Sequence, residues 1–222
     1  MSPWETLEAE IVACRRCPRL VAWREEIAAT KRRAFRQEGY WGRPVPGFGD
    51  RAARVLIVGL APGAHGANRT GRMFTGDSSG DFLYPALYRA GLANQPRSQR
   101  PGDGLALRDA FITAVCRCAP PANKPNAQEL AACRPYLERE IALLDRVQVI
   151  VALGRIAFDA IVQIYHAGRP AFAHAAVYTL GPGRPYLIAS YHPSRQNTQT
   201  GRLTTEMFDQ VWAQALRILA NP

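Results

Sequence analysis

Four short apolar runs alternate with helix-like segments along this chain, and this alternation constrains the fold more than any other feature. The runs cover residues 55–58, 111–115, 147–153 and 186–190. Each has the length of a strand, and each is apolar enough to be buried on both faces, as the strands of a parallel sheet are. Strands that alternate with helices predict a parallel sheet with helices on both faces, and therefore an α/β fold.

Length and composition indicate one domain. The 222 residues are 47% hydrophobic, which suits a single core of ordinary size. No internal repeat or Pro/Gly-rich linker divides the sequence. We expect a single domain over residues 1–222, beginning with a helical segment at about 1–36.

The start of the chain does not resemble a targeting or membrane segment. Glu5, Glu8 and Glu10 interrupt it, and no run approaches the roughly 18 apolar residues that span a bilayer. We expect a cytoplasmic protein without a membrane partner, and a monomer.

The charge is strongly basic and unevenly distributed. The net charge is +10, and 26 of the 28 basic residues are arginine. Residues 15–54 hold eleven basic residues against four acidic ones. Because arginine offers planar, bidentate contacts to phosphate, this segment predicts a polyanionic partner. The alternative is an ordinary solvated face in a chain that favours arginine.

The cysteines indicate metal or redox chemistry, because a reducing compartment disfavours a disulfide framework. Cys14 and Cys17 form a C-x-x-C pair, and Cys118 and Cys133 lie far along the chain. Four thiolates suit either tetrahedral zinc or an iron–sulfur cluster, and spacing does not choose between them. Thiols packed as small hydrophobic side chains are the alternative. Cys116 is interpreted as the spare cysteine.

Two loops that follow apolar runs carry the candidate chemistry. The first, GLAPGAHGANRTGRMFTGD after residue 58, combines glycines with Phe74 and Asp77. Its glycines allow close backbone approach to a ligand, although Asp77 can also cap the next helix and Phe74 can pack in the core. The second, YHPSRQN, brings His192 to the carboxyl edge of the sheet, where such folds bind ligands. An imidazole there can donate to a developing anion or be purely structural.

Other catalytic signatures are missing. The chain lacks the G-x-x-x-x-G-K-[ST] phosphate loop and a G-x-G-x-x-G turn that opens a helix, which disfavours nucleotide hydrolysis and dinucleotide redox chemistry. It also lacks the paired H-x-E and P-C-x-x-C motifs of zinc deaminases.

Taken together, these motifs resemble family 5 of the uracil-DNA glycosylase superfamily. The resemblance covers most of the chain, through the glycine loop, FITAVCRCAPPANKP, the C-x-x-C pair and HPSRQN. It implies a three-layer α/β/α fold with a central four-stranded parallel sheet, and monofunctional excision of damaged bases from DNA. It also implies a 4Fe–4S cluster, held by Cys14, Cys17, Cys118 and Cys133, that ties down the N-terminal segment.

The resemblance also implies roles for individual residues. Asp77 would be the catalytic carboxylate that positions the attacking water, and Asn123 would help to hold that water. His192 would donate a hydrogen bond to the carbonyl oxygen of the base. The implied substrate-binding residues are Gly59, Leu60, Ala61, Pro62, Gly63, Phe74, Ala114, Ser194 and Asn197.

Two positions separate family 5 from family 4. Family 4 carries an acidic residue at the position of Leu60 and a uracil-reading asparagine at the position of Ala114, and this chain has neither. The resemblance therefore implies removal of uracil and of other deaminated bases such as hypoxanthine and xanthine. A family 4-like enzyme strict for uracil and a non-catalytic iron–sulfur DNA-binding module are the alternatives.

Overall fold

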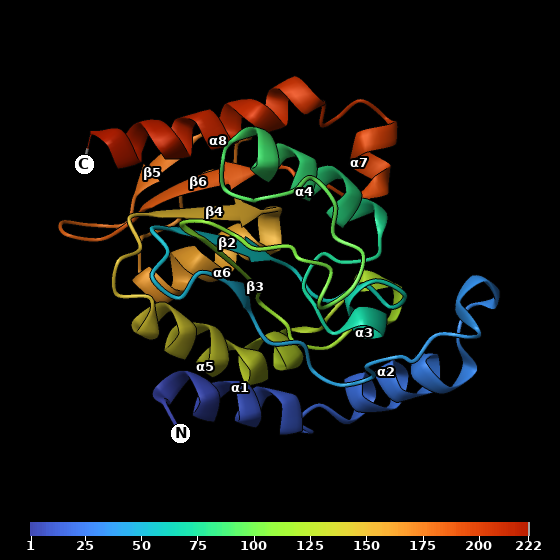
Figure 1. Ribbon diagram of the computed structural model, residues 1–222. Helices are drawn as coiled ribbons and strands as arrows, with labels where there is room; N and C mark the ends of the chain where they lie inside the picture. Colours follow the sequence, from blue (N-terminus) through green and yellow to red (C-terminus); the bar gives the residue numbers. More distant parts are fainter. Residues whose placement is uncertain (222) are drawn as a thin grey trace.

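A six-stranded mixed sheet forms the centre of the computed structural model, which describes residues 1–221 (Figure 1). The strand order is β1-β3-β2-β4-β6-β5. The strands are β1 (Phe48–Gly49), β2 (Val55–Gly59), β3 (Ala110–Ala114), β4 (Val149–Leu153), β5 (Val177–Thr179) and β6 (Tyr186–Ser190). The four predicted strands, β3, β2, β4 and β6, are neighbours and pair in parallel. The predicted α/β architecture with a parallel centre is confirmed.

The two outer strands were not predicted, and they enlarge the sheet from four strands to six. β1 pairs antiparallel with β3, and β5 pairs antiparallel with β6. β1 has only two residues, one of them glycine, and β5 exposes Val177 and Thr179. Short edge strands of this kind lack the buried apolar run that marks a central strand.

Helices cover both faces of the sheet, as the alternation of elements predicts (Figure 1). The α-helices are α1 (Pro3–Ala13), α2 (Pro18–Thr30), α3 (Ala67–Thr70), α4 (Ser78–Arg89), α5 (Ala127–Leu143), α6 (Arg155–Tyr165), α7 (Arg195–Gln199) and α8 (Thr205–Ala220), and the 3₁₀ turns are η1 (Arg33–Phe35) and η2 (Pro121–Asn123). Within residues 1–221, no helix is long and apolar enough to cross a membrane.

Side chains alternate between the two faces along each central strand, because successive strand residues point in opposite directions. Ile57 of β2 packs in one core with Leu83 of α4 and Trp212 of α8. Leu56 packs in a second core with Phe158 of α6. The sheet is thus buried on both sides, and functional side chains are confined to its edges.

The N-terminal helical segment consists of two helices with a break at the C-x-x-C pair. Ser2 caps α1, and Pro18 begins α2 immediately after Cys17, a position where proline's missing N–H costs nothing. α1 packs along α5, whereas α2 and η1 extend outward beside the carboxyl edge of the sheet (Figure 1). The break leaves Cys14 and Cys17 between the two helices.

A reciprocal capping box begins α5. Asn126 Oδ1 accepts from the N–H of Glu129 at 2.9 Å, and Glu129 Oε2 accepts from the N–H of Asn126 at 2.8 Å. This box satisfies two N–H groups at the start of the helix. It fixes where α5 begins, six residues before Cys133.

Candidate active site

Asp77 is positioned by both of its carboxylate oxygens. Oδ1 accepts from the N–H groups of Ser79 and Gly80, each at 3.1 Å, so Asp77 caps α4. Oδ2 lies against the glycine loop: a Cβ built on Gly63 would be 2.7 Å from it, and one on Gly66 only 1.9 Å. The capping role, which the sequence left as an alternative, therefore coexists with a second oxygen that faces the loop.

The environment of Asp77 disfavours its charged form. Burial raises the pKa of Asp77 above its ordinary value, and the backbone hydrogen bonds from Gly80 and Ser79 only partly oppose this. A poorly solvated carboxylate is a stronger base and interacts more strongly with a nearby positive charge. These are the properties required to orient water or to stabilise a cationic sugar.

Phe74 lies across the end of β2. Its backbone is in the left-handed region, with φ of 52°, and a Cβ on Gly59 would be only 2.6 Å from the ring atom Cζ. Gly59 is thus required for the ring to rest on the strand. The Phe74 ring also lies 6.0 Å from the His192 ring, centroid to centroid, with 30° between the planes. The loops after β2 and β6 meet at this contact.

His192 is fixed by its own loop. Asn197 Nδ2 donates to the His192 carbonyl at 2.8 Å, and Ser194 caps α7 by accepting from the N–H of Asn197 at 3.4 Å. Burial lowers the pKa of His192 to about 4. Its imidazole is therefore neutral near pH 7 and has a single N–H to donate.

The remaining predicted substrate-binding residues are divided between backbone and side-chain roles. Within residues 1–221, the backbone N–H groups of Ala61 and Gly63 donate no hydrogen bond, so they are free to meet a ligand. Leu60 is half-buried beside them, Pro62 is buried, and Ala114 is buried beside Gly59 in the sheet. Ser194 and Asn197 use their side chains to organise the His192 loop.

Among the described residues, Asn123 forms no hydrogen bond with this group. It lies on the exposed η2 turn with φ of 56°, and no hydrogen bond of its side chain is formed within the described part of the chain. η2 follows β3 at the same sheet edge. The predicted role of Asn123 stays a prediction.

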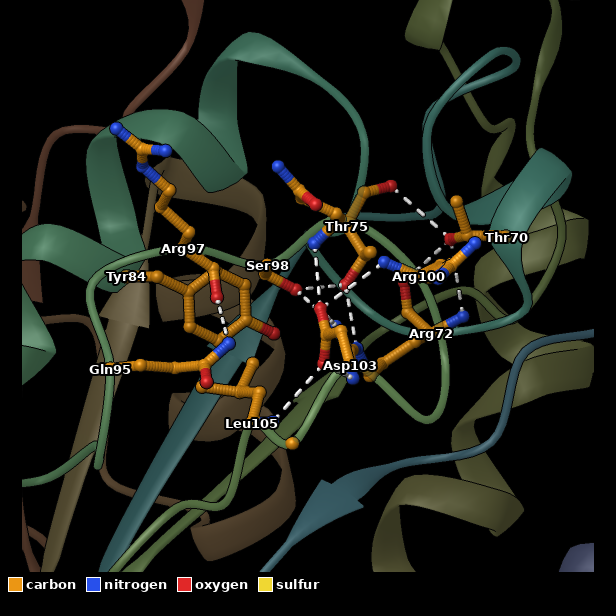
Figure 2. Close-up of polar contacts among 12 residues, drawn as sticks. Thr70, Arg72, Thr75, Tyr84, Gln95, Arg97, Ser98, Arg100, Asp103 and Leu105 are labelled. Carbon is orange, nitrogen blue, oxygen red and sulfur yellow. Dashed lines mark hydrogen bonds and ion pairs between the residues drawn. The ribbon is translucent and has the colours of Figure 1, made fainter.

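A buried polar network that sequence reasoning missed holds the Phe74 loop (Figure 2). Arg72 donates to Asp103 at 2.9 and 2.7 Å, to Ser98 Oγ at 2.8 Å and to Thr75 Oγ1 at 3.0 Å. Burial alone raises the pKa of Asp103, but hydrogen bonds from Arg72 and from backbone N–H groups hold it well below its usual range. The network fixes the residues on both sides of Phe74. Arg72 and Asp103 are 31 residues apart in sequence, so no local pattern indicates their pairing.

All five cysteines gather where the break between α1 and α2 meets the segment that runs from the end of β3 into α5. Cys17, Cys116, Cys118 and Cys133 share one apolar cluster, and Cys14 packs on the neighbouring one. The buried Arg24 donates to Cys118 Sγ at 3.0 Å, and the N–H of Arg117 donates to Cys133 Sγ at 3.4 Å. These donors suit sulfur atoms that carry negative charge.

Cys116 differs from the other cysteines in its bonding. Its thiol donates to the carbonyl of Cys118 at 3.5 Å. Hydrogen bonding to Cys133, together with burial, raises the pKa of Cys116 far above its ordinary value. Burial also raises the pKa of Cys118, to about 12, so the direction of the pKa shift does not separate Cys116 from the predicted ligands, and its interpretation as the spare cysteine stays a prediction.

Four cysteine thiolates suit either a tetrahedral zinc ion or an iron–sulfur cluster. Among residues 1–221, no group of three or more His, Cys, Asp or Glu side chains is arranged to hold a metal ion.

Comparison with known proteins agrees with this geometry. The family profile of the uracil DNA glycosylase superfamily matches residues 46–216, and the chain belongs to that superfamily, a class of DNA glycosylases. A type-5 uracil-DNA glycosylase of Thermus thermophilus is 58% identical over 216 residues, which cover 96% of this chain and 97% of the relative. A type-5 enzyme of Mycobacterium tuberculosis is 52% identical over 96% of this chain and 80% of its own length.

The type-4 relatives have lower sequence identity to this chain and match a smaller part of it. One from Pyrobaculum aerophilum is 40% identical over 126 residues, which cover 56% of this chain. Within the superfamily, this chain is therefore a member of the type-5 family, as the residues at positions 60 and 114 predicted.

Proposed function

We propose that this protein hydrolyses the N-glycosidic bond of uracil, and also of hypoxanthine and xanthine, in DNA. It acts monofunctionally and leaves an abasic site. The observation that carries the proposal is the placement of Asp77: one oxygen is bound to the start of α4, and the other faces the glycine loop beside Phe74. The loop after β2 supplies the carboxylate and the aromatic ring, and the loop after β6 supplies a neutral imidazole, all at one edge of the sheet.

The chemistry requires the target nucleotide to leave the duplex, because its glycosidic carbon is inaccessible in the stack. One face of the Phe74 ring rests on Gly59, and the base stacks against the ring. His192 donates its single N–H to the base oxygen that becomes anionic as the bond stretches. Asp77 holds the attacking water and stabilises the oxocarbenium-like sugar. Such preorganised electrostatic groups are typically the largest contributions to catalysis.

The range of bases that the site accepts depends on which groups hydrogen-bond to the edge of the base. Leu60 and Ala114 offer no polar side-chain atom, so the free N–H groups of Ala61 and Gly63 become the donors to the base. Backbone donors accept any base that presents an acceptor on that edge. A site that instead pairs a buried polar side chain with one base rejects others strongly. The proposed site therefore tolerates several deaminated bases.

Single-turnover excision on duplexes that contain uracil, hypoxanthine or xanthine tests the proposal. The wild-type protein should release each base and leave strands that break on alkali treatment but not before it. His192→Ala should lower the uracil rate about 10²–10³-fold, because one donor to the leaving oxygen is lost. The matched control is His166→Ala, which changes an exposed histidine at the end of α6 and should leave the rate unchanged.

The alternatives give different results in this assay. Uracil release without hypoxanthine or xanthine release would indicate a family 4-like enzyme. DNA binding without any alkali-sensitive strands would indicate a non-catalytic module and refute the proposal. Strand breaks before alkali treatment would contradict the monofunctional reaction.

We also propose that Cys14, Cys17, Cys118 and Cys133 hold a 4Fe–4S cluster with a structural role. The fit rests on the gathered sulfur atoms and on the donors from Arg24 and Arg117. When bound, the cluster supplies a covalent link between the N-terminal helices and the segment from β3 to α5. Arg24 neutralises part of its charge, and no step of base excision passes through it.

Cys17→Ser should lose iron and the brown colour of the purified protein. Because the link to α2 is broken, limited proteolysis should cut residues 1–36 much faster than in the wild type. Cys116→Ser is the matched control and should keep its iron, since Cys116 lies outside the proposed ligand set. A colourless, zinc-replete wild-type protein, or iron loss in both variants, would show that the ligand assignment is wrong.

A further inference from the structure

The structure divides the basic segment 15–54 into two groups of arginines. The ion-paired group consists of Arg15 with Glu25, Arg19 with Glu129, Arg24 with Glu25, Arg51 with Glu8 and Arg54 with Asp109. Two of these pairs, Arg19 with Glu129 and Arg51 with Glu8, join the N-terminal helices to the rest of the molecule. The charge available to a polyanion is therefore smaller than the sequence indicates, and it is concentrated elsewhere in the segment.

The second group lies on residues 31–43, which we call the basic arm. Arg32, Arg33 and Arg36 are exposed there, and none of them forms an ion pair within residues 1–221. Lys31 is occupied, because its Nζ donates to the carbonyl of Glu38 at 2.8 Å and closes the arm. Glu38, the single carboxylate of the arm, is bound by Arg69. Arg32, Arg33 and Arg36 thus give the outer part of the arm three free guanidinium groups. Arg43, at the end of the arm, is also exposed, and its guanidinium lies 5.9 Å from the Trp41 ring.

The basic arm is attached to the loop that holds Asp77. The guanidinium of Arg69 lies 3.9 Å from the centre of the Phe35 ring, and its Nη2 donates to the carbonyl of Gly76 at 3.1 Å. Tyr40 OH pairs with His65 Nδ1 at 3.0 Å. The arm therefore stands beside the proposed active site, in a fixed position, and extends beyond it (Figure 1).

We infer that Arg32, Arg33 and Arg36 bind the phosphates of duplex DNA next to the flipped nucleotide. This inference rests on the proposed function, which places a DNA strand at the edge of the loop. A planar guanidinium binds phosphate oxygens in pairs, and such contacts fix the register of the duplex without reading its sequence. Base choice then remains with the glycine loop, while the arm supplies affinity and orientation.

The test compares two triple variants that lose the same charge. The arm variant is Arg32→Gln, Arg33→Gln and Arg36→Gln. The control is Arg146→Gln, Arg169→Gln and Arg217→Gln, which changes three exposed arginines without ion pairs in the described residues. These precede β4, follow α6 and lie in the last turn of α8, on the opposite side of the molecule from the arm (Figure 1).

Binding to a uracil-containing duplex is measured by fluorescence anisotropy over a range of salt concentrations. The plot of the logarithm of the binding constant against the logarithm of the salt concentration has a negative slope. In the arm variant this slope should be shallower by about 2 to 3, which is about 0.9 for each phosphate that is no longer neutralised. At low salt its Kd should rise about ten-fold or more. The control should keep the wild-type slope. Single-turnover excision at saturating DNA should be unchanged in both variants, since the arm touches no reacting atom.

An arm variant with the wild-type slope, or equal reductions of the slope in the two variants, would overturn the inference. A lower rate at saturating DNA in the arm variant would also overturn it, because the arm would then act on the chemistry. Failure of the proposed function is a separate result. It would be seen as wild-type protein that releases no base, and the difference in salt slope between the two variants would still report on the arm.

Discussion

Asp77→Asn should lower the single-turnover rate of uracil excision about 10²–10³-fold while the protein stays folded and still binds DNA. The substitution separates the two roles of Asp77. Asparagine is as good a helix cap as aspartate, so its side-chain oxygen can keep accepting from Ser79 and Gly80. The negative charge beside Gly63 and Gly66 is lost, and with it the group that holds water and stabilises the sugar cation.

Asp81→Asn is the matched control for this variant. It makes the same change in the same helix, but Asp81 is exposed in the first turn of α4, so its excision rate should equal that of the wild type. The melting temperature of each variant shows whether the fold is retained. An Asp77→Asn protein that excises uracil at the wild-type rate would remove Asp77 from the reaction.

The carboxylate of Asp77 also determines how the excision rate falls at low pH. Because burial raises the pKa of Asp77, the excision rate should begin to fall at a higher pH than an ordinary carboxylate would give, as protonation removes the charge. His192, whose pKa is lowered to about 4, adds no step near pH 6 to 7. In Asp77→Asn, the residual excision rate should no longer show this fall at low pH.

Glu140→Gln should lower the free energy of unfolding by about 3–5 kcal/mol, the usual cost of leaving a buried charge without its partner. The side chains of Arg117 and Glu140 are each only 1% exposed, and they form an ion pair. Glu140 Oε2 also accepts from Thr113 Oγ1 at 2.5 Å. Arg117 Nε and Nη1 form no hydrogen bond among the described residues, so Glu140 is the only carboxylate among them that binds the guanidinium.

Two further variants test whether the loss of stability comes from the unpaired buried charge. Chemical denaturation measures the free energy of unfolding of each variant. Glu138→Gln removes a carboxylate from an exposed pair with Arg134 and should cost at most about 1 kcal/mol. Arg117→Met combined with Glu140→Leu removes both buried charges and should recover most of the stability. A double variant no more stable than Glu140→Gln would show that the pair itself, and not the orphaned charge, contributes the stability.

The parts of the molecule that could be predicted from sequence are those with local signals. The four central strands are continuous apolar runs, and the cap of α5 is a short Asn-x-x-Glu pattern. The edge strands β1 and β5 could not be predicted, because a two-residue strand and a half-exposed one have no such pattern. The same division holds at the site, where the glycine loop and His192 stand out in sequence and the Arg72–Asp103 network does not.

The sequence by itself determined the alternation of the four central strands with helices, the loops that carry Phe74, Asp77 and His192, and the type-5 family. Only the tertiary structure decided which groups meet. It placed one Asp77 oxygen against Gly63 and Gly66, it left Asn123 on an exposed turn, and it separated the paired arginines from the free ones of the basic arm. The physical reason is that periodicity and motifs act between near neighbours in the chain. Burial, pKa and ion pairing depend instead on groups that the fold brings together from distant segments.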